Sequence, residues 1–332
     1  MSSVSAWFKR YLLQFVLLIV VLSSMYAFNP QFHVESSIER IIPLGVMAAG
    51  LAVTMIAGEF DLSIASMAAF SGAVTVALSG LGLPVSVTIG ILSGILLGML
   101  QGWAIAKLGI SSLVFTVGTL ILIRGMTWLV CGGLSIRVDD ITATDIFRGK
   151  ILFLSPLSIT ALAILIGLGV FLSRTRWGRE LYALGGARPE AIAAGVRYKR
   201  GMVVAFGISG GCSAVGGSLV SALGGSAAPG ALEVMLVTAL SAVLVGGISL
   251  AGGRGTMVNV FLGFSIIAIL SAGLAGMGAK AFVSVLFIGL LLLVVVLLDY
   301  FLRFVSERDR RNRIRLAAAQ AASHEAKVFV GV

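Results

Sequence analysis

Long apolar runs, separated by short polar segments, make up most of this chain of 332 residues. A helix needs roughly 20 apolar residues to cross the hydrocarbon layer of a bilayer, and the chain offers runs near that length from end to end. The candidate spans cover residues 11–29, 41–57, 62–79, 84–106, 110–130, 151–173, 201–223, 233–249, 256–275 and 281–302. Strands of an outer-membrane barrel would instead alternate apolar and polar residues. The pattern therefore predicts an all-α, polytopic helical membrane protein with about ten transmembrane helices.

The composition of the chain indicates that most of its surface faces lipid. Hydrophobic residues make up 58% of the chain, charged residues make up 11%, and the mean hydropathy is +1.08. A water-soluble domain does not carry such a balance. The net charge of +10 would indicate nucleic-acid binding in a soluble protein. Here the basic residues cluster beside the ends of apolar runs, where they mark the cytoplasmic side, so we expect no nucleic acid as a partner.

Three basic clusters predict the orientation of the chain. They are Lys9 with Arg10, residues 174–200 and residues 303–315. With the amino terminus inside, an even number of spans places all three on the cytoplasmic side. Such clusters also attract anionic lipid or an acidic protein surface. We predict that both termini are cytoplasmic, that residues 1–302 form the transmembrane domain, and that residues 303–332 form a basic cytoplasmic tail.

The polar segment Gly58–Ser66 interrupts two apolar runs with two carboxylates, Glu59 and Asp61, and two hydroxyls, Ser63 and Ser66. Ionisable groups at membrane depth are costly and are usually functional or paired, so these four residues are candidates for the translocation pathway. Alternatively, the Asp61 carboxylate caps the next helix by accepting its free backbone N–H groups. The two interpretations are compatible, because a broken helix with an exposed N-terminal end is a common way to build a polar site in a bundle.

The inner connection, residues 174–200, predicts a short helix between Pro189, which suits a first helical turn, and Gly195, which suits a helix end. Its small residues would let it sit closely in a groove of another protein. Because Ala191 and Ala194 are three residues apart, they are predicted to share one side of this helix. The alternative is an amphipathic loop that lies on the membrane surface.

Glycines within the spans predict close helix packing. Those in one span, Gly90, Gly94, Gly98 and Gly102, recur every four residues. This spacing places a smooth stripe on one helix face, where a neighbouring backbone can approach; direct substrate contact is the alternative. A weaker echo pairs Gly58–Ser63 with Gly246–Ala251, as in inverted-repeat transporters, without defining the register of a repeat.

Five segments together resemble the ribose-type sugar permeases of ATP-binding-cassette (ABC) importers, whose relatives include branched-chain amino-acid and autoinducer-2 permeases. The segments are Gly58–Ser66, Gly102–Ile110, Ile123–Gly125, Tyr182–Gly195 and Gly246–Gly255. The resemblance implies the ABC importer permease fold in the bacterial inner membrane and translocation of a monosaccharide or similar small polar solute. Family members commonly carry an acidic run before the glycine pair that corresponds to Gly246-Gly247, whereas here the acidic residue Glu233 lies further upstream.

The same resemblance implies the partners and the contact with them. The expected partners are two ATP-binding cassette domains, a second permease subunit in a homo- or heterodimer, a periplasmic solute-binding protein and membrane lipid. The inner connection would be the cassette-coupling element. Its implied residues are Gly178, Arg179, Gly185, Glu190, Ala191, Ala194 and Gly195. The sequence has no GxxxxGK[ST] pattern, so we expect a non-enzymatic transport subunit, with ATP hydrolysed by separate cassettes.

Two other classes of function compete with this interpretation. An ion-coupled secondary transporter would use Asp61 or Glu59 as its ion site, but the spans lack further strong charges. A membrane enzyme would need a convergent catalytic set, and the histidines, His33 and His324, lie in a loop and in the tail. The two cysteines form no CxxC motif. We therefore expect no metal site and no cofactor.

Overall fold

The computed structural model of the chain describes residues 3–29, 34–145, 149 and 155–298, with the side chains of residues 3–10 and 34–41 left undescribed. The chain forms two compact units, Met1–Ile288 and Gly289–Val332. The first unit contains nearly all of the described structure. The predicted cytoplasmic tail, residues 303–332, lies outside the described residues, so its boundary at residue 302 stays a prediction.

The described part of the chain is almost entirely helical. Its α-helices are α1 (Ser3–Phe28), α2 (Val34–Ile56), α3 (Ile64–Ala77), α4 (Leu83–Leu108), α5 (Ser112–Val130), α7 (Pro156–Arg174), α8 (Arg176–Gly186), α9 (Arg188–Ala193), α10 (Tyr198–Gly224), α11 (Glu233–Val245), α12 (Met257–Gly276) and a last helix, Ala281–Leu298. Short 3₁₀ helices cover Ser79–Leu81 and Thr142–Thr144. The strands β1 (Ile136–Arg137) and β2 (Ser226–Ala227) pair antiparallel, with Ile136 opposite Ala227.

The helices confirm a polytopic helical membrane protein, and each predicted span overlaps one of them. Within the described residues, seven helices are long and apolar enough to cross a membrane. Three apolar helices are shorter: Ile42–Ile56, Ile64–Ala77 and Glu233–Val245. At 1.5 Å per residue, a helix of 14 residues such as α3 reaches only about 21 Å, less than the ~30 Å hydrocarbon layer. The count of ten crossings therefore stays a prediction.

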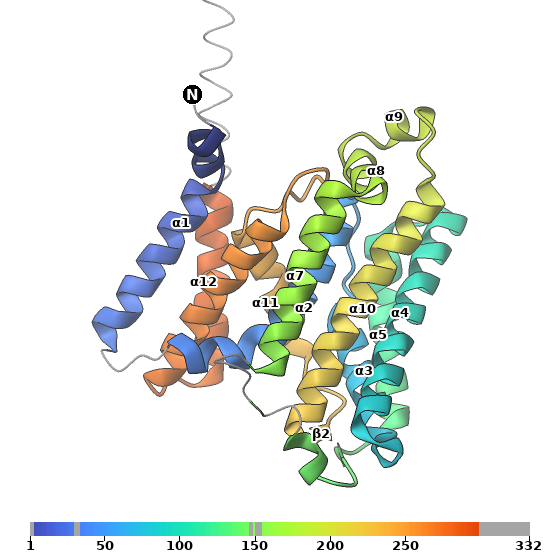
Figure 1. Cartoon of the computed structure of the whole chain (residues 1–332), viewed down its shortest axis with the longest axis vertical. Helices are drawn as coiled ribbons and strands as arrows, with labels where there is room; N and C mark the ends of the chain where they lie inside the picture. The colour runs from blue at the N-terminus through green and yellow to red at the C-terminus, as the bar shows by residue number, and fades with distance from the viewer. Residues whose placement is uncertain (1–2, 30–33, 146–148, 150–154, 299–332) are drawn as a thin grey trace, which may run out of the picture. The chain divides into compact units, whose positions relative to one another are not determined.

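Helix α10 lies at the centre of the bundle, packed against α4, α3 and α2 (Figure 1). Its contact with α4 confirms the predicted glycine stripe. A Cβ on Gly98 would collide with the backbone oxygen of Phe206, and a Cβ on Gly102 would collide with that of Met202. The two backbones therefore touch directly, which is how helices gain dispersion energy when both the protein and the lipid are apolar.

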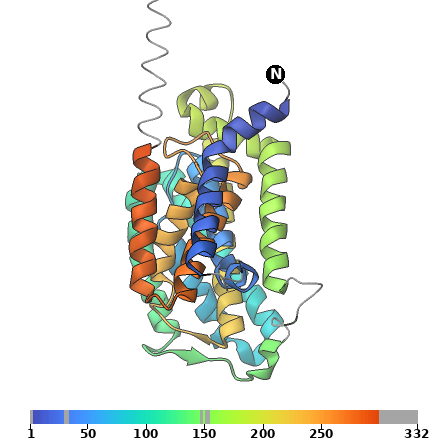
Figure 2. The same cartoon turned by 90° about the vertical axis from the view of Figure 1, so that its left-hand side faces the viewer.

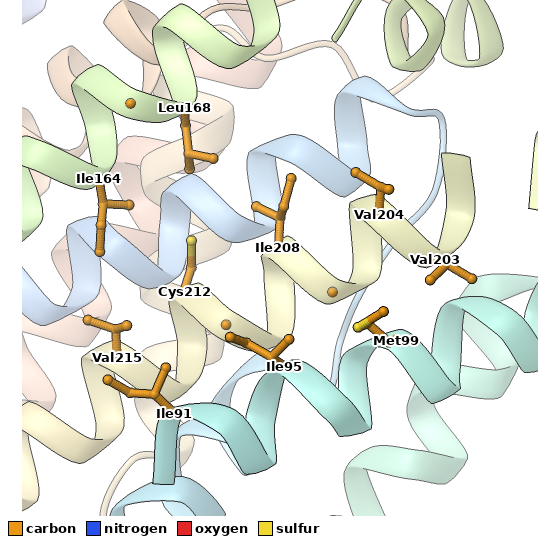
Figure 3. Close-up of a pocket in the computed structure, with 13 residues that line it drawn as sticks. Ile91, Ile95, Met99, Ile164, Leu168, Val203, Val204, Ile208, Cys212 and Val215 are labelled. Atoms are coloured by element: carbon orange, nitrogen blue, oxygen red, sulfur yellow. The ribbon is translucent and has the colours of Figure 1, made fainter. Parts of the chain in front are cut away.

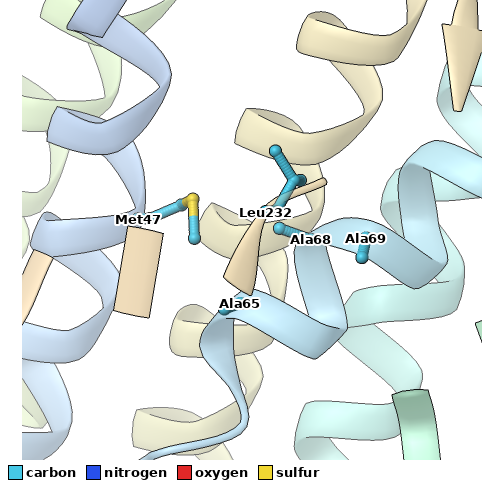
Figure 4. Close-up of a cluster of buried hydrophobic side chains, with 5 residues drawn as sticks. All are labelled: Met47, Ala65, Ala68, Ala69 and Leu232. Atoms are coloured by element: carbon cyan, nitrogen blue, oxygen red, sulfur yellow. The ribbon is translucent and has the colours of Figure 1, made fainter. Parts of the chain in front are cut away.

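A small apolar cluster joins α2, α3 and the residue before α11 (Figure 4). Met47 of α2 packs against Ala65, Ala68 and Ala69 of α3 and against Leu232, which directly precedes α11. All five side chains are buried. The alanines keep α3 thin enough to pack closely with its neighbours on both sides, and they account for the burial of this short helix.

The polar elements gather at the two ends of the helical bundle. Figure 1 shows α8 and α9 at one end and β2 at the other. The N-terminal end of α1 lies at the same end as α8 and α9 in both Figure 1 and Figure 2. The hydrogen bond of 3.0 Å between the hydroxyls of Tyr11 in α1 and Thr256 before α12 agrees with this placement. The amino terminus and the inner connection thus lie at the same end of the bundle, as predicted.

Candidate functional site

The first of two helix breaks follows α2 and contains the predicted polar segment. Gly58 has φ of 80° and donates its N–H to the oxygen of Met55, while the N–H of Glu59 donates to Thr54. This pair of bonds is the Schellman ending, which favours glycine because only glycine adopts positive φ without strain. The chain then runs through the buried residues Glu59, Asp61 and Ser63 before α3 begins.

Asp61 is the centre of a buried polar network. Its Oδ1 accepts hydrogen bonds from the backbone N–H of Ser63 at 3.0 Å and from the Ser63 hydroxyl at 2.6 Å. Its Oδ2 accepts from the hydroxyl of Ser209 in α10 at 2.7 Å. The Ser63 hydroxyl also bonds Gln101 of α4, which donates to Thr119 of α5 at 3.0 Å. One carboxylate therefore ties the break to three surrounding helices.

This geometry corrects the capping interpretation of Asp61. The residue at the N-cap of α3 is Ser63, and its side chain makes no capping hydrogen bond. Asp61 lies two residues earlier and accepts the N–H of Ser63 in an Asx-turn. The buried carboxylate thus shapes the break itself and leaves the first free N–H groups of α3 uncapped by its oxygens.

Glu59 is held by the segment that follows α8. Its Oε1 accepts from the guanidinium of Arg188 at 2.6 Å and from the hydroxyl of Tyr198 at 3.2 Å. Arg188 also stacks over the Tyr198 ring, 5.0 Å from the centroid. The Glu59 side chain is only 7% exposed and that of Arg188 is 38% exposed, so the pair lies at the margin of the bundle. It links residues 129 positions apart in the chain.

The second break follows α11 and repeats the first in its backbone. Gly247 has φ of 89°, its N–H donates to Leu244, and the N–H of Ile248 donates to Val243. This is the same Schellman pair as at Gly58. The same pair also ends α9, at Gly195, so this ending is shared by several helices and the internal repeat suggested by the sequence echo stays a prediction. The remainder of the break runs to Thr256, whose hydroxyl caps α12 by accepting the N–H of Asn259.

The two breaks meet beneath the C-terminal end of α8. The N–H of Gly253 donates to the oxygen of Ile56 at 2.9 Å. A Cβ on Gly185 would collide with that same oxygen and would lie 2.6 Å from the Gly253 nitrogen and 2.9 Å from the Gly58 nitrogen. We call the backbones of Gly58, Gly185, Gly252 and Gly253 the glycine junction. Tyr182 of α8 adds a hydrogen bond of 2.7 Å to the oxygen of Gly255.

Local chemistry explains the shape of the inner connection. The Thr175 hydroxyl caps α8 by accepting the N–H of Gly178 at 3.1 Å. Gly178 lets α8 turn back tightly, because a Cβ there would meet the backbone of Phe171 and Leu172. Helix α9 has Pro189 in its first turn and ends in a Schellman pair at Gly195, with φ of 89°. The predicted short helix between Pro189 and Gly195 is confirmed.

The structure separates the residues predicted to face a cassette into two groups. Arg179, Glu190, Ala194 and Gly195 are exposed. Gly178 and Ala191 are buried, and Gly185 belongs to the glycine junction. The prediction that Ala191 and Ala194 share one accessible side is wrong, because α9 ends at Ala193 and Ala191 faces the rest of the chain. The large apolar side chain exposed on α9 is that of Ile192, 47% exposed.

A cavity of about 180 Å³ lies among α3, α5 and the start of α11. Its polar lining comes from Ser66, Arg124 and Glu233, and Arg124 forms an ion pair with Glu233. Of the four predicted pathway residues, only Ser66 lines this cavity. The side chains of Glu59, Asp61 and Ser63 make the contacts described above. Sequence reasoning did not assign a role to Arg124 or Glu233, although both are charges within or beside apolar runs.

Gln101 and Ser209, which complete the Asp61 network, were also missed as functional residues. A glutamine in the middle of an apolar run is costly unless it is hydrogen-bonded, and that signal could have identified Gln101. No group of three metal-ligating residues occurs in the part of the chain that the structure describes.

Comparison with known proteins identifies the family of the chain. The family described as the branched-chain amino acid transport system permease component matches residues 34–296. The chain belongs to this permease family. The match spans both helix breaks, the inner connection and all helices from α2 to α12, so the predicted resemblance to ABC importer permeases is confirmed.

Sugar permeases are among the similar curated proteins. The ribose import permease protein RbsC of Bacillus subtilis (strain 168) is 30% identical over 289 residues, covering 86% of this permease and 90% of the relative. The fructose import permease protein FrcC of Rhizobium meliloti is 28% identical, covering 87% and 86% of the two chains. The L-arabinose transport system permease protein AraH of Escherichia coli (strain K12) is 31% identical, covering 77% and 78%. No solved structure matches the permease.

Proposed function

We propose that this chain is the membrane-spanning permease subunit of an ABC importer and that it carries a monosaccharide, or a similar small polar solute, across the bacterial inner membrane. Relatives named for ribose, fructose and L-arabinose import support a pentose or hexose as the substrate class. The family membership favours this function over the ion-coupled alternative.

The observation that carries the proposal is the glycine junction beneath α8. A transport subunit without its own ATP site must convert a push from a partner into a movement of its spans. Here α8 touches the backbone of both helix breaks, and Arg188, just beyond it, holds Glu59. Because the backbones are in direct contact, α8 cannot shift without moving its neighbours, and a displacement of α8 and α9 moves both breaks together.

The solute pathway is proposed to pass the cavity beside Ser66. A sugar offers hydroxyl groups that donate and accept hydrogen bonds, and the cavity presents a hydroxyl, a guanidinium and a carboxylate. The ion pair between Arg124 of α5 and Glu233 of α11 spans this cavity. Because the two charges belong to different helices, separation of α5 from α11 would open the cavity and release both groups to the solute.

Membership of the permease family supports a proposed assembly. We propose a homo- or heterodimer of permease subunits, two ATP-binding cassettes that contact α9 from the cytoplasm, and a periplasmic binding protein at the end that carries β1 and β2. Both termini would be cytoplasmic, in agreement with the basic residues around α8 and α10. Reporter fusions after Gly195 and after Asp140 should report the cytoplasm and the periplasm, respectively; the opposite result would reverse the orientation.

Reconstitution with the cognate cassette and binding protein tests the proposed function. Uptake of a panel of radiolabelled pentoses and hexoses into proteoliposomes should require ATP inside the same compartment as the cassette. Collapse of the proton and sodium gradients should leave uptake unchanged. Uptake that follows an ion gradient and proceeds without ATP would instead establish the ion-coupled alternative.

The α9 contact has a separate test. Ala194 is exposed at the end of α9, so Ala194→Glu should weaken the cassette contact by about 1–3 kcal/mol through added bulk. Ala183→Glu is the matched control, because Ala183 is an exposed alanine on α8. Co-purification of the cassette and stimulation of its ATPase should fall for Ala194→Glu alone, at equal permease abundance. Full stimulation in that variant would remove α9 from the contact.

A further inference from the structure

A large apolar groove lies on the outer face of α10, between α4 and α7 (Figure 3). Its volume is about 560 Å³, within the range of about 300–1,000 Å³ common for small-molecule sites. All of its lining residues are apolar. They are Ile91, Ile95 and Met99 of α4, Ile164, Gly167 and Leu168 of α7, and Val203, Val204, Gly207, Ile208, Gly211, Cys212 and Val215 of α10.

Glycines give the groove its depth. A Cβ on Gly207 would lie 2.9 Å from Cγ of Met99, and a Cβ on Gly211 would lie 2.9 Å from Cγ1 of Ile95. The side chains of Met99 and Ile95 therefore pack directly against the α10 backbone, which makes the groove deeper at these positions. Helices α7 and α10 each pack on α2, which sets the width of the groove. Its apolar lining and its volume can accommodate a flexible apolar chain.

A second cavity, of about 260 Å³, lies between α8 and the start of α10. It is lined by Arg176, Trp177, Glu180, Gly195, Arg197 and Arg200. Arg176 donates to Glu180 at 2.7 Å, which neutralises one of the three guanidinium groups. Arg197 and Arg200 are exposed and leave the cavity with a positive excess. Trp177 is 44% exposed and is of the residue type that favours the headgroup level of a bilayer.

Both walls of the apolar groove lead toward this basic cavity. On α10, Arg200 lies four residues before Val204, so these two residues share a helix face. Arg197 is the N-cap residue directly before α10 and lines the same basic cavity as Arg200. Four residues span about 6 Å along the helix axis. On α7, Leu168 lies six residues before the last residue, Arg174, and α8 begins directly afterwards at Arg176. The basic cavity therefore lies beyond the α8 end of the groove.

We propose that the groove and the basic cavity together bind one anionic glycerophospholipid from the leaflet on the α8 side. Its phosphate is held by Arg197 and Arg200, because guanidinium groups form charge-assisted, bidentate hydrogen bonds with phosphate. One of its acyl chains lies along Ile208 and Leu168 in the groove. Charge and apolarity thus occur in the order in which a phospholipid presents them, which distinguishes this occupant from a transmembrane helix of another protein.

The headgroup half of the proposal is tested with purified permease in detergent and native mass spectrometry. Phosphatidylglycerol and phosphatidylcholine with matched acyl chains serve as probes, and wild type should retain the former. The double variant Arg197→Gln/Arg200→Gln should lose roughly 30-fold in affinity for phosphatidylglycerol, from about 1 kcal/mol per basic residue near the surface. Lys199→Gln is the matched control, because Lys199 is exposed between them and does not line the cavity.

The groove half is tested by filling the apolar space. Ile208→Trp should displace phosphatidylglycerol, with Leu122→Trp on α5 as the control, since Leu122 is 62% exposed and outside the groove. Thermal unfolding confirms that each variant folds; Val204→Trp replaces Ile208→Trp if the latter does not. An excess of inorganic phosphate should not displace the lipid, because the acyl chain contributes most of the binding.

Three results would overturn the proposal. Equal retention of phosphatidylglycerol by wild type and the arginine double variant would remove the phosphate site. If Ile208→Trp changes the number of subunits in the purified complex but leaves lipid retention intact, the groove binds a helix of another protein. An arginine double variant that keeps its lipid and loses its cassette would assign the basic cavity to the cassette. None of these readouts depends on transport, so they leave the proposed function untouched.

Discussion

The two helix breaks begin with the same type of backbone turn but differ in the side chains that stabilise them. Each begins with the same Schellman pair, at Gly58 after α2 and at Gly247 after α11. The first break then buries two carboxylates, Glu59 and Asp61, which accept hydrogen bonds from side chains of α9, of α10 and of the break itself. The second break contains Gly252, Gly253 and Gly255, and much of its bonding comes from backbone groups.

The difference indicates two ways of holding an irregular segment inside a bundle. Backbone polar groups at membrane depth must be satisfied by protein, because lipid offers no hydrogen bonds. The first break meets this need with side chains, for example Ser112 and Thr116, whose hydroxyls accept from the N–H groups of Phe60 and Leu62. The second break meets it through close backbone approach. We therefore expect the first break to be sensitive to charge and the second to volume.

Gly185→Ala should have the largest effect, because Gly185 touches both breaks. The added Cβ would collide with the oxygen of Ile56, and the junction can relieve this only by moving the backbone, at a cost of about 3 kcal/mol or more. Thermal unfolding in detergent and membrane abundance would measure it. Gly186→Ala is the control, since its Cβ would lie 4.0 Å from the Cα of Gly253. Equal stability of the two variants would mean that Gly185 does not pack closely against the two breaks.

Gly252→Ala isolates volume at the second break. Gly252 combines φ of 80° with a Cβ position 2.7 Å from the oxygen of Gly185 and 2.8 Å from the Cα of Gly58. Strain and overpacking together should cost about 2–4 kcal/mol. Gly278→Ala has nearly the same φ, 77°, with no atom near its Cβ, so it should cost only the strain, about 1 kcal/mol. If both variants lose the same stability, packing at the second break is not tight.

The parts of this comparison that follow from sequence are local. Apolar runs predicted the helices, the spacing of four predicted the glycine stripe on α4, and Pro189 and Gly195 predicted the ends of α9. Each depends on residues within one or two helical turns. Gly58 and Asp61 marked the first break for the same reason, since polar groups interrupt an apolar run there.

The contacts that make the site could not be read from sequence because they join distant residues. Arg188 and Glu59 are 129 residues apart, and neither segment carries a sequence signal that identifies the other as its partner. The crossing of Gly253 with Ile56 uses backbone atoms alone, which leave no side-chain signature. The spacing rule failed for Ala191 and Ala194 because α9 ends between them, so helical periodicity no longer relates their directions.

Asp61→Asn tests charge at the first break. The carboxylate accepts three hydrogen bonds, and an amide turns one acceptor into a donor that faces the Ser209 or the Ser63 hydroxyl. The variant should lose about 1–3 kcal/mol of stability, seen as lower thermal stability and abundance. The corresponding change at the second break is Ser249→Ala, which removes only the bond that Ala251 donates to the Ser249 hydroxyl. A larger loss from Ser249→Ala would reverse the comparison.

The smallest effect on stability is expected for Glu59→Gln. This variant distinguishes a contribution of Glu59 to folding stability from a role in coupling α8 and α9 to the first break. Glutamine keeps an oxygen for Arg188 and Tyr198 but loses the charge. Because the Arg188 side chain is 38% exposed, water replaces much of the lost attraction, and the cost should be about 1 kcal/mol or less. The pair nevertheless connects the α8–α9 end with the first break, so stimulation of the cassette ATPase by loaded binding protein should fall while abundance is unchanged.

A double-mutant cycle with Arg188→Gln isolates the pair: if the two residues act together, the double variant should be no worse than Arg188→Gln alone. Effects on stimulation that simply add would show that Glu59 and Arg188 serve the importer independently, and coupling would then rest on the glycine junction.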